Sequence, residues 1–247
     1  MSFRKINQKM IQSYEMDLYR HYPPDRMLRM LSNEIYVALK ANGYPFPALQ
    51  QNLGATWMTG TSDAHFFRDV QVEGYDAWVE LFAAPLRRTK AVFMTEVIAA
   101  MGGDPVAKLS VAVMAVSVQQ RKVIPTQTVA EALGAPEVEL MEGVPPRITL
   151  PEEMEPSFSL PIRHFDCDRN GHVRAHRYVD FVCEAAGYWE QGHHVSPERL
   201  RMEYNAECLP GDQLTMYTCP TEEGIYVKGV KQDGAISFKS CLKWKES

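Results

Sequence analysis

The chain lacks the features by which membrane, secreted and disulfide-bonded proteins are usually identified. No apolar run approaches the roughly 18 to 20 residues of a membrane span, and the opening segment, MSFRKINQKMIQSYE, has no apolar core of a secretory signal. The five cysteines form an odd set without a CxxC pair or zinc-type spacing, which argues against a disulfide framework and against structural zinc. We therefore expect a cytoplasmic protein without a membrane span, metal or redox cofactor.

An excess of positive charge is also missing. There are 26 Lys and Arg residues against 31 Asp and Glu residues, so the net charge is −5 at pH 7. No stripe of basic and aromatic residues offsets this balance, and we expect no binding to nucleic acid. What the chain does have is an ordinary globular composition. Its 247 residues, 45% of them hydrophobic, are enough for one large domain or two small ones.

Two segments have the hydrophobic periodicity of an amphipathic helix with one buried face. In the second half, apolar residues fall at positions i, i+3, i+4, i+7, i+8 and i+11, namely Tyr178, Phe181, Val182, Ala185, Ala186 and Trp189. The first half has a similar stripe, formed by Met27, Met30, Leu31, Ile35, Ala38 and Leu39. The two predicted helices occupy corresponding places in the two halves.

Strand-like runs surround each predicted helix in the same order. SYEMDLY precedes the first helix and SFSLPIRHF the second. HFFRDVQVEGYDAWVELFAA, KAVFMTEVIAAMGGDP and AKLSVAVMAVSVQQRK follow the first; ERLRMEYNAECLPGDQLTMYT, EGIYVKGVKQDG and AISFKSCLKWK follow the second. The turns MGGDP, LPGDQ and KQDG have hairpin chemistry. The order predicts an α+β fold and is typical of a tandem hotdog, although periodicity alone does not exclude another α+β layout.

Composition divides the chain between these halves. The stretch APEVELMEGVPPRITLPEEMEP is rich in proline and acidic residues and indicates a linker. We therefore expect an N-terminal domain over residues 1–125, a linker over 126–156 and a C-terminal domain over 157–247. One further segment of the first half, YPFPALQQNLGATWMTGTS, is expected to be either a lid or an irregular excursion.

The segment HFDCDRNGHV, residues 164–173, resembles the first half of a calcium loop. Asp166, Asp168, Asn170 and Gly171 occupy positions 1, 3, 5 and 6, but the bidentate glutamate of position 12 is replaced by Arg177. A polar turn with a left-handed glycine explains the Asp, Asn and Gly residues equally well. Neither interpretation accounts for the histidine that follows Gly171.

The same segment resembles the acyl-ACP thioesterases, a plant-type family with bacterial members and two hotdog domains in one chain. Asp168-x-Asn170-x-His172-Val173, followed by Tyr178, matches the family's D-x-N-x-H-V pattern and helix tyrosine. In MEYNAECLPGD, Glu207 and Cys208 match its E-Y-x-x-E-C strand; SYEMD and MAVSVQQRKVIP are weaker landmarks. RAHRY departs from the family where a second asparagine pair is usual.

This resemblance implies a double hotdog, in which each half is a long helix wrapped by an antiparallel sheet. It also implies hydrolysis of fatty acyl-ACP to free fatty acid and holo-ACP, which terminates fatty acid synthesis. Acyl carrier protein would be the partner, and no cofactor would be needed. The loop is similar as well to the D-x-D-x-x-G-x-V loop of single-domain acyl-CoA thioesterases. An acyl-CoA thioesterase and an inactive hotdog that binds acyl carriers therefore stay as alternatives.

The expected catalytic residues are Asp168, Asn170, His172 and Glu207. His172 and Glu207 are the titratable candidates for activating water, and the Asn170 amide can hold water or carbonyl. Asp168 either orients that amide or attacks directly. Free backbone N–H groups near residues 171–174, at a helix N-terminus, are expected to polarise the thioester oxygen.

Cys208 invites a Cys-His alternative. If it lies on a strand, however, it faces away from the side that Glu207 faces. The first half has no D-x-N-x-H pattern before its helix, so we expect it to be catalytically empty and to bind the acyl chain or support the fold. Basic residues around the loop, and the pair Arg121 and Lys122, could attract an acidic carrier protein. A homodimer is possible, because single hotdogs pair through their sheets.

The missing glutamate at position 12 gives a first prediction. Neither added calcium nor EDTA should change the melting temperature or the activity of the protein, because a cation stands where the strongest anionic ligand belongs. Thermal unfolding with and without each agent checks this. A calcium-dependent rise in melting temperature would restore the metal interpretation.

Overall fold

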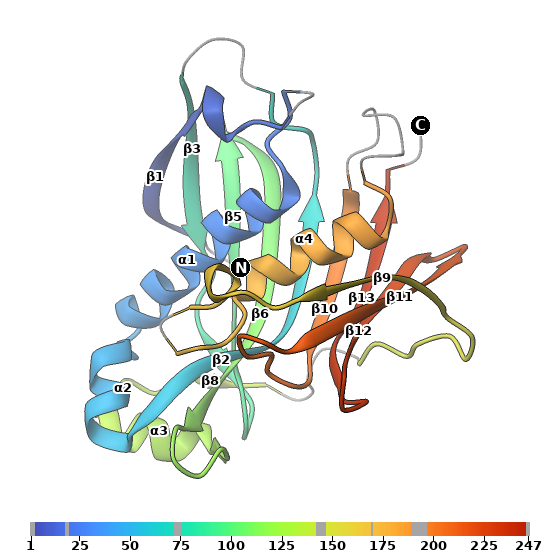
Figure 1. Ribbon diagram of the computed structural model, residues 1–247. Coiled ribbons are helices and arrows are strands. Elements are labelled where there is room, and N and C mark those ends of the chain that lie inside the picture. The colour runs from blue at the N-terminus through green and yellow to red at the C-terminus, as the bar shows by residue number, and fades with distance from the viewer. Residues whose placement is uncertain are drawn as a thin grey trace.

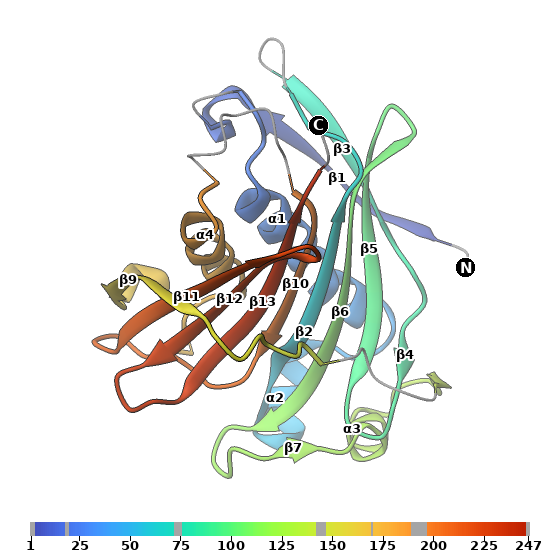
Figure 2. The same ribbon diagram turned by 90° about the vertical axis from the view of Figure 1, so that its right-hand side faces the viewer.

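A computed structural model describes residues 3–17, 20–71, 76–141, 147–168, 170–188 and 197–245 (Figure 1). In it, two long helices, α1 (Pro24–Ala41) and α4 (Ala175–Ala185), lie next to each other against a large curved sheet. Figure 2 shows the strands of both halves running side by side across this sheet. None of the helices in the described ranges is long and apolar enough to cross a membrane.

The sheet is antiparallel along its main path, which runs β1-β3-β5-β6-β2-β10-β13-β12-β11-β9. The first half supplies β1 (Arg4–Gln12), β2 (Ala55–Phe66), β3 (Asp76–Ala83), β5 (Phe93–Met101) and β6 (Asp104–Ser117). The second supplies β9 (Glu155–Pro161), β10 (Pro197–Tyr204), β11 (Gln213–Thr221), β12 (Gly224–Lys231) and β13 (Ile236–Trp244). Three short strands lie off this path: β4 (Arg87–Arg88), β7 (Val123–Ile124) and β8 (Glu139–Leu140).

The two halves join where β2 pairs with β10. The paired residues run from Arg199 opposite His65 to Glu203 opposite Thr61. Arg199 also forms a two-pronged ion pair with Asp63, with nitrogen–oxygen distances of 2.9 and 2.6 Å. The fork of a guanidinium matches a carboxylate in this way. The strands of both halves therefore form one continuous sheet.

Both predicted helices are confirmed, and their stripes enter the core. α1 has Pro24 at its first position, where the missing N–H costs nothing, and Asp25 in its first turn. All six residues of its predicted stripe are buried. In α4 the side chains of Tyr178, Phe181 and Val182 are buried, whereas Trp189 lies outside the described residues. Each helix thus has the single buried face that its sequence predicts.

Two local predictions were wrong. The strand expected at SYEMDLY lies earlier, as β1, and Ser13–Glu15 forms a 3-10 turn. β1 is an edge strand with mostly polar side chains, so hydrophobic alternation does not mark it. The segment expected to be a lid or excursion is instead helix α2 (Phe46–Leu53) followed by β2, which lies inside the sheet.

The segment predicted as a linker is partly regular structure. It contains helix α3 (Thr126–Leu133), which packs against α2 and β6, and the short strand β8, which pairs with β4. Further along, the N–H of Ile148 donates to the buried carboxylate of Glu203 at 3.0 Å. Residues 126–156 therefore do more than connect two halves, and the domain boundaries at 125 and 157 stay a prediction.

The contact between α1 and α4 includes two acidic side chains. Asp25 of α1 and Asp180 of α4 are hydrogen-bonded to each other. Burial, together with the neighbouring Asp25 carboxylate, raises the pKa of Asp180 to about 6, against 3.8 for a free aspartate. Burial also raises the pKa of Asp25. Between pH 4 and about pH 6, the folded protein therefore holds a proton on Asp180 that the unfolded chain releases.

Stability should consequently fall as pH rises. A carboxyl group whose pKa is raised by folding stabilises the protein below its unfolded pKa near 3.8, and that contribution is lost as pH rises through about 6. Asp180→Asn stays neutral at every pH. Relative to the parent, its free energy of unfolding should therefore improve by about 1 to 3 kcal/mol between pH 4 and pH 7.

Urea unfolding of both proteins across this pH range measures the difference. Glu222→Gln, which removes a carboxyl group from an exposed turn, is the matched control. Its free energy of unfolding should change with pH in parallel with that of the parent. Parallel pH profiles for Asp180→Asn and the parent would show that no proton is shared between α1 and α4.

Candidate active site

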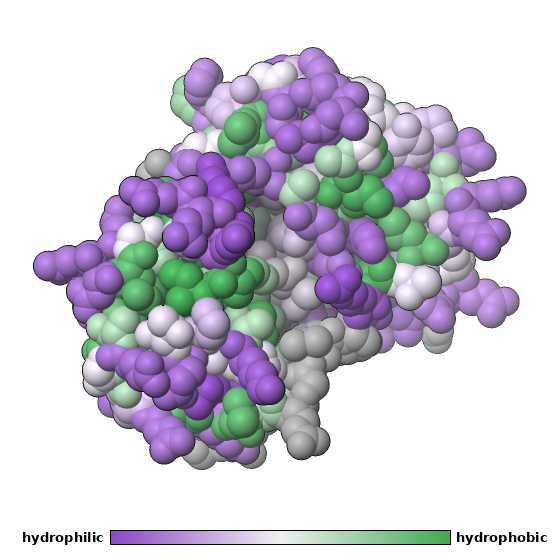
Figure 3. All heavy atoms as spheres, turned by 90° about the horizontal axis from the view of Figure 1, so that it is seen from below, coloured by the Kyte–Doolittle hydropathy of each residue, from purple (hydrophilic) through white to green (hydrophobic). Residues whose placement is uncertain are grey.

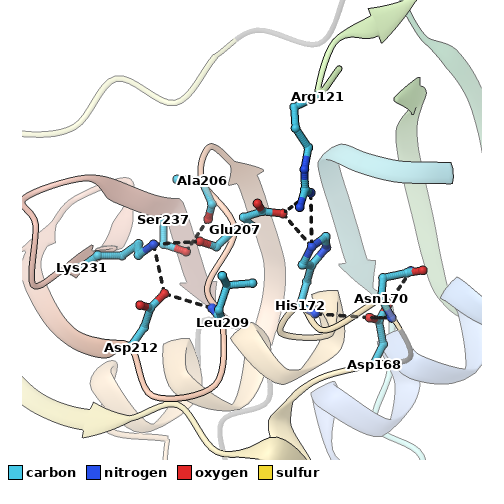
Figure 4. A network of polar contacts seen from close by, with 10 residues as sticks. All are labelled: Arg121, Asp168, Asn170, His172, Ala206, Glu207, Leu209, Asp212, Lys231 and Ser237. Atoms are coloured by element: carbon cyan, nitrogen blue, oxygen red, sulfur yellow. Dashed lines mark hydrogen bonds and ion pairs between the residues drawn. The ribbon is translucent and has the colours of Figure 1, made fainter. Parts of the chain in front are cut away.

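The sequence-predicted residues lie on two loops of the C-terminal half (Figure 4). One loop joins β9 to α4, and the other joins β10 to β11. In the first loop, the buried carboxylate of Asp166 accepts a hydrogen bond from Arg177 Nε at 2.8 Å and one from the N–H of Arg163 at 2.8 Å. Arg177, which stands at position 12 of the calcium-like segment, thus neutralises Asp166 at position 1. This favours a turn over a calcium site.

Asp168 organises the turn that follows. Its Oδ1 accepts the N–H of Asn170 at 2.7 Å and that of His172 at 3.5 Å, and its Oδ2 accepts the Asn170 side-chain amide at 3.2 Å. Gly171 has φ = 80°, the left-handed conformation that glycine adopts without steric cost. Both oxygens of Asp168 are therefore engaged, which fits an orienting role better than that of a nucleophile.

The second loop brings Glu207 against His172. Their side chains meet with 2.7 Å between His172 Nε2 and Glu207 Oε2, and the two residues are 15% and 31% exposed. This spacing is that of a hydrogen bond between a base and the group that orients it. The two motifs, 35 positions apart in the sequence, thus form one polar pair.

Interactions with β12 and β13 fix this second loop (Figure 4). Lys231 Nζ donates to the backbone oxygen of Glu207 at 3.2 Å and forms an ion pair with Asp212 at 3.0 Å. The hydrogen bond to Asp212 raises the pKa of Lys231. Ser237 Oγ donates to the backbone oxygen of Ala206 at 2.9 Å. The backbone oxygens of Ala206 and Glu207 are therefore both held by side chains of the neighbouring strands.

Glu207 and Cys208 do not lie on a strand, contrary to the sequence prediction. β10 ends at Tyr204, because the next two N–H groups both bond to the backbone oxygen of Ser237 and the chain leaves the ladder. The two side chains nevertheless point apart. Cys208 is fully buried with its Sγ 3.1 Å from Ser237 Oγ, and burial raises the pKa of its thiol. A reactive thiolate is therefore disfavoured at this position.

The backbone donors expected near residues 171–174 are largely used. The N–H groups of Gly171, Val173 and Arg174 bond to the backbone oxygens of Asp168, Cys208 and Asp166 at 3.0 to 3.1 Å. The expectation that they are free was wrong, because the turn and the β10–β11 loop consume them. α4 begins at Ala175, and the N–H of Arg177 bonds to Arg174 O at 2.9 Å, so the N–H groups of Ala175 and His176 are the ones in the first turn without an intrahelical partner.

A residue from the first half completes the site, and sequence reasoning missed it. Arg121 Nη1 lies 2.9 Å from Glu207 Oε2 and 3.5 Å from His172 Nε2. It comes from the turn between β6 and β7. The only sequence signal was that Arg121 belongs to a basic pair with Lys122, a pattern shared with many solvated surfaces. Through Arg121, the first half therefore contacts the predicted catalytic pair.

A pocket of about 220 Å³ opens beside these residues, and both halves line it. The second half contributes all four predicted residues, and the first contributes Tyr36 of α1, residues 56–59 of β2 and Met114 of β6. The pairing of β2 with β10 stops at Thr61 and Glu203, next to an irregularity between Thr59 and Thr61. Beyond that point the two chains separate, which leaves the space for the pocket.

A second pocket, of about 200 Å³, adjoins the first between α1 and the sheet. The two share several lining residues, among them Tyr36, Thr59 and Ala175. Its aliphatic lining from the first half consists of Leu28, Ile35, Leu109, Val111 and Val113. His176 also lines it; burial, assisted by nearby arginines, lowers the pKa of this histidine to about 4. The imidazole is therefore neutral at pH 7.

The basic residues expected around the loop differ in their availability. Arg177 is held by Asp166 and Asp180, so its charge is already balanced. Arg163 and Arg174 are exposed, and Phe165 between them on the chain is 90% exposed. Arg169 and the pair His193 and His194 lie outside the described residues. Figure 3 shows one face of the molecule hollowed near its middle, with polar and apolar residues around the hollow.

Both loops lie in a part of the chain that matches a known protein family. Residues 151–246, which carry both loops, match the model of the acyl-ACP thioesterase C-terminal domain. These residues belong to the acyl-ACP thioesterase family. The predicted family is therefore confirmed over the part of the chain that holds Asp168, Asn170, His172 and Glu207. Among curated proteins, none matches the sequence.

Solved structures of thioesterases resemble the whole chain. A protein from Lactobacillus plantarum named an oleoyl thioesterase has a TM-score of 0.79 at 16% identity, covering 99% of this chain and 95% of its own. An acyl-ACP thioesterase from Bacteroides thetaiotaomicron has a TM-score of 0.76 at 15% identity, and the match covers 97% of each chain. The 12:0-ACP thioesterase from Umbellularia californica has a TM-score of 0.75 at 14% identity, and the match covers 98% of this chain and 97% of its own. The predicted double hotdog fold is confirmed across both halves.

Proposed function

We propose that this protein is a thioesterase that hydrolyses fatty acyl-ACP to free fatty acid and holo-ACP. The observation that carries the proposal is the 2.7 Å contact of His172 with Glu207, in a pocket on the loops of an acyl-ACP thioesterase domain. The membership of residues 151–246 in this family supports thioester hydrolysis as the reaction. The same reasoning makes acyl carrier protein the partner and fatty acid synthesis the process.

In the proposed reaction, the pair formed by Glu207 and His172 takes a proton from a water molecule. The water oxygen attacks the thioester carbon and forms a carbon–oxygen bond, while the carbonyl oxygen gains negative charge. The carbon–sulfur bond then breaks, and the pair returns the proton to the leaving sulfur. Free acid and carrier thiol are the products, and no cofactor takes part.

Asn170 and the start of α4 have supporting roles in this proposal. The Asn170 amide, oriented by Asp168, binds the water or the carbonyl. The first N–H groups of α4, those of Ala175 on the pocket wall and of His176, stabilise the oxyanion. Donors fixed by a helix act without reorganising when the charge develops.

The acyl chain would enter the adjoining pocket between α1 and the sheet. The apolar lining there comes from the first half, which fits the expectation that this half binds the chain. His176, neutral at pH 7, adds no charge to oppose an apolar chain. The substitution of RAHRY for the usual asparagine pair thus falls on this pocket, where Arg174 and His176 are lining residues.

The location and assembly belong to the same proposal. We place the protein in the cytoplasm, where its carrier would be available. Among the described strands, β1 and β9 end the sheet, and an exposed edge can pair with a second copy in a homodimer. An acyl-CoA thioesterase is the alternative enzyme, and an inactive acyl-carrier-binding hotdog is the alternative without catalysis.

Replacing Glu207 and Cys208 separately tests the proposed base. Glu207→Gln keeps the shape of the side chain but cannot accept the proton, so turnover of acyl-ACP should fall by about a hundredfold or more. Cys208→Ala removes a buried sulfur atom and should lower the free energy of unfolding by about 1 to 3 kcal/mol with little loss of rate. Thiol release by the purified variants and urea unfolding measure both effects.

The opposite pattern would overturn this assignment. If Cys208→Ala were inactive and Glu207→Gln kept its rate, a cysteine nucleophile with a covalent acyl-enzyme would replace the proposed mechanism. Treatment of the parent with iodoacetamide gives a second measure, because the buried Cys208 should not react and activity should persist.

Salt dependence distinguishes the two carriers. Turnover of acyl-ACP should fall more steeply with added salt than turnover of acyl-CoA, because screening weakens the attraction of a highly charged acidic protein to exposed residues such as Arg163 and Arg174. Assays with both carriers across a range of acyl lengths measure this. Equal salt dependence, with CoA esters as the better substrates, would favour the acyl-CoA alternative.

A further inference from the structure

Among the described residues, Arg121 is the cation that contacts the side chains of the proposed catalytic pair. Its Nη1 lies between the Glu207 carboxylate, at 2.9 Å, and His172 Nε2, at 3.5 Å. In Figure 4 the side chain extends from the β6–β7 turn of the first half toward the loops of the second. The Arg121 side chain is 57% exposed, so an ion pair here would add little to stability on its own. Its position calls for a reason other than folding.

The backbone of Arg121 points to the same conclusion. Its φ of 54° is in the left-handed region, where a side chain is disfavoured and glycine is the usual residue. The turn is closed on both sides, since the Arg121 N–H bonds to Ser117 O at 2.9 Å and the Ser117 N–H bonds to Lys122 O at 2.9 Å. An arginine in a conformation that favours glycine indicates that its side chain is needed.

Binding of the carrier's phosphate does not explain the contact of Arg121 with Glu207 and His172. The phosphate of a pantetheine arm lies at the opposite end of the arm from the thioester, whereas Arg121 touches the two residues placed at the thioester. The neighbouring Lys122 is exposed, and its side chain forms no hydrogen bond or ion pair with the described residues. Of this basic pair, only Arg121 is directed at the site.

We propose that Arg121 is a positioning residue: it holds the Glu207 carboxylate against His172, and through it the first half completes the catalytic centre of the second. This inference rests on the proposed function. A guanidinium has several donors in a fixed plane, so Arg121 can hold one oxygen of Glu207 without taking the proton that the base must accept. Without it, the carboxylate would be free to turn into solvent.

Arg121→Gly separates this role from a structural one. Glycine suits the left-handed backbone, so the melting temperature should equal or exceed that of the parent. The value of kcat for acyl-ACP should nevertheless fall by about 10- to 100-fold, with KM unchanged, because the base is displaced while the binding pockets are intact. Arg121→Lys, which keeps the charge but not the planar fork, should recover part of the rate.

The matched control is Gln119→Gly, which places glycine at an exposed position of the same turn and should leave kcat unchanged. Arg121→Asn is a second test variant, because asparagine also tolerates the left-handed conformation. It should show the same loss of kcat as Arg121→Gly. Guanidinium ions added at low concentration should raise the rate of Arg121→Gly but not that of the parent.

A double substitution identifies the route of the effect. If Arg121 acts through Glu207, then adding Arg121→Gly to Glu207→Gln should cause no further loss of kcat. Full additivity of the two losses, or a parent rate in Arg121→Gly, would overturn the inference while the proposed function stands. A parent that hydrolyses neither acyl-ACP nor acyl-CoA would instead reject the proposed function, and the inference with it.

Discussion

The pairing of β2 with β10 is the constraint on which the site depends. These two strands, one from each half, align residues 61–65 with residues 199–203 and are locked by the ion pair of Arg199 with Asp63. A one-residue slip would turn every side chain of β10 to the other face of the sheet. The register therefore determines where the chain stands when it leaves β10 and enters the loop that carries Glu207. It also sets the distance between that loop and the β6–β7 turn.

The pocket exists because this pairing stops. β10 ends at Tyr204, while β2 continues beyond it through residues 56–59. The space between the diverging chains is lined by both halves and lies beside α1 and the start of α4. Active sites often lie where two packed units meet, since neither unit can fill the space alone. The sequence motifs of the site lie in the second half alone, whereas the pocket beside them is formed by both halves.

Charge in the site is arranged in balanced pairs on rigid supports. Asp166 is paired with Arg177, Asp212 with Lys231, and Glu207 with both His172 and Arg121. A buried or half-buried charge without a partner would be costly, so such pairs let a polar loop sit against an apolar core. Because Lys231 also binds the Glu207 backbone, the same ion pair holds the loop that carries Glu207 in place. The backbone of the proposed base is therefore held in part by a residue of β12, outside the recognised motif.

The sequence by itself determined the periodic elements and the motif residues. The stripes of α1 and α4 and the strand-like runs that contain β5, β6, β12 and β13 follow from local sequence, because they depend on which nearby side chains avoid water. The motifs likewise placed Asp168, Asn170 and His172 on one loop. Tertiary structure decided the rest: that β10 ends before Glu207, that the N–H groups of residues 171, 173 and 174 are consumed, and that Arg121 reaches the site from 86 residues away. These features depend on contacts between segments distant in the chain, and such contacts leave no periodic trace in a single sequence.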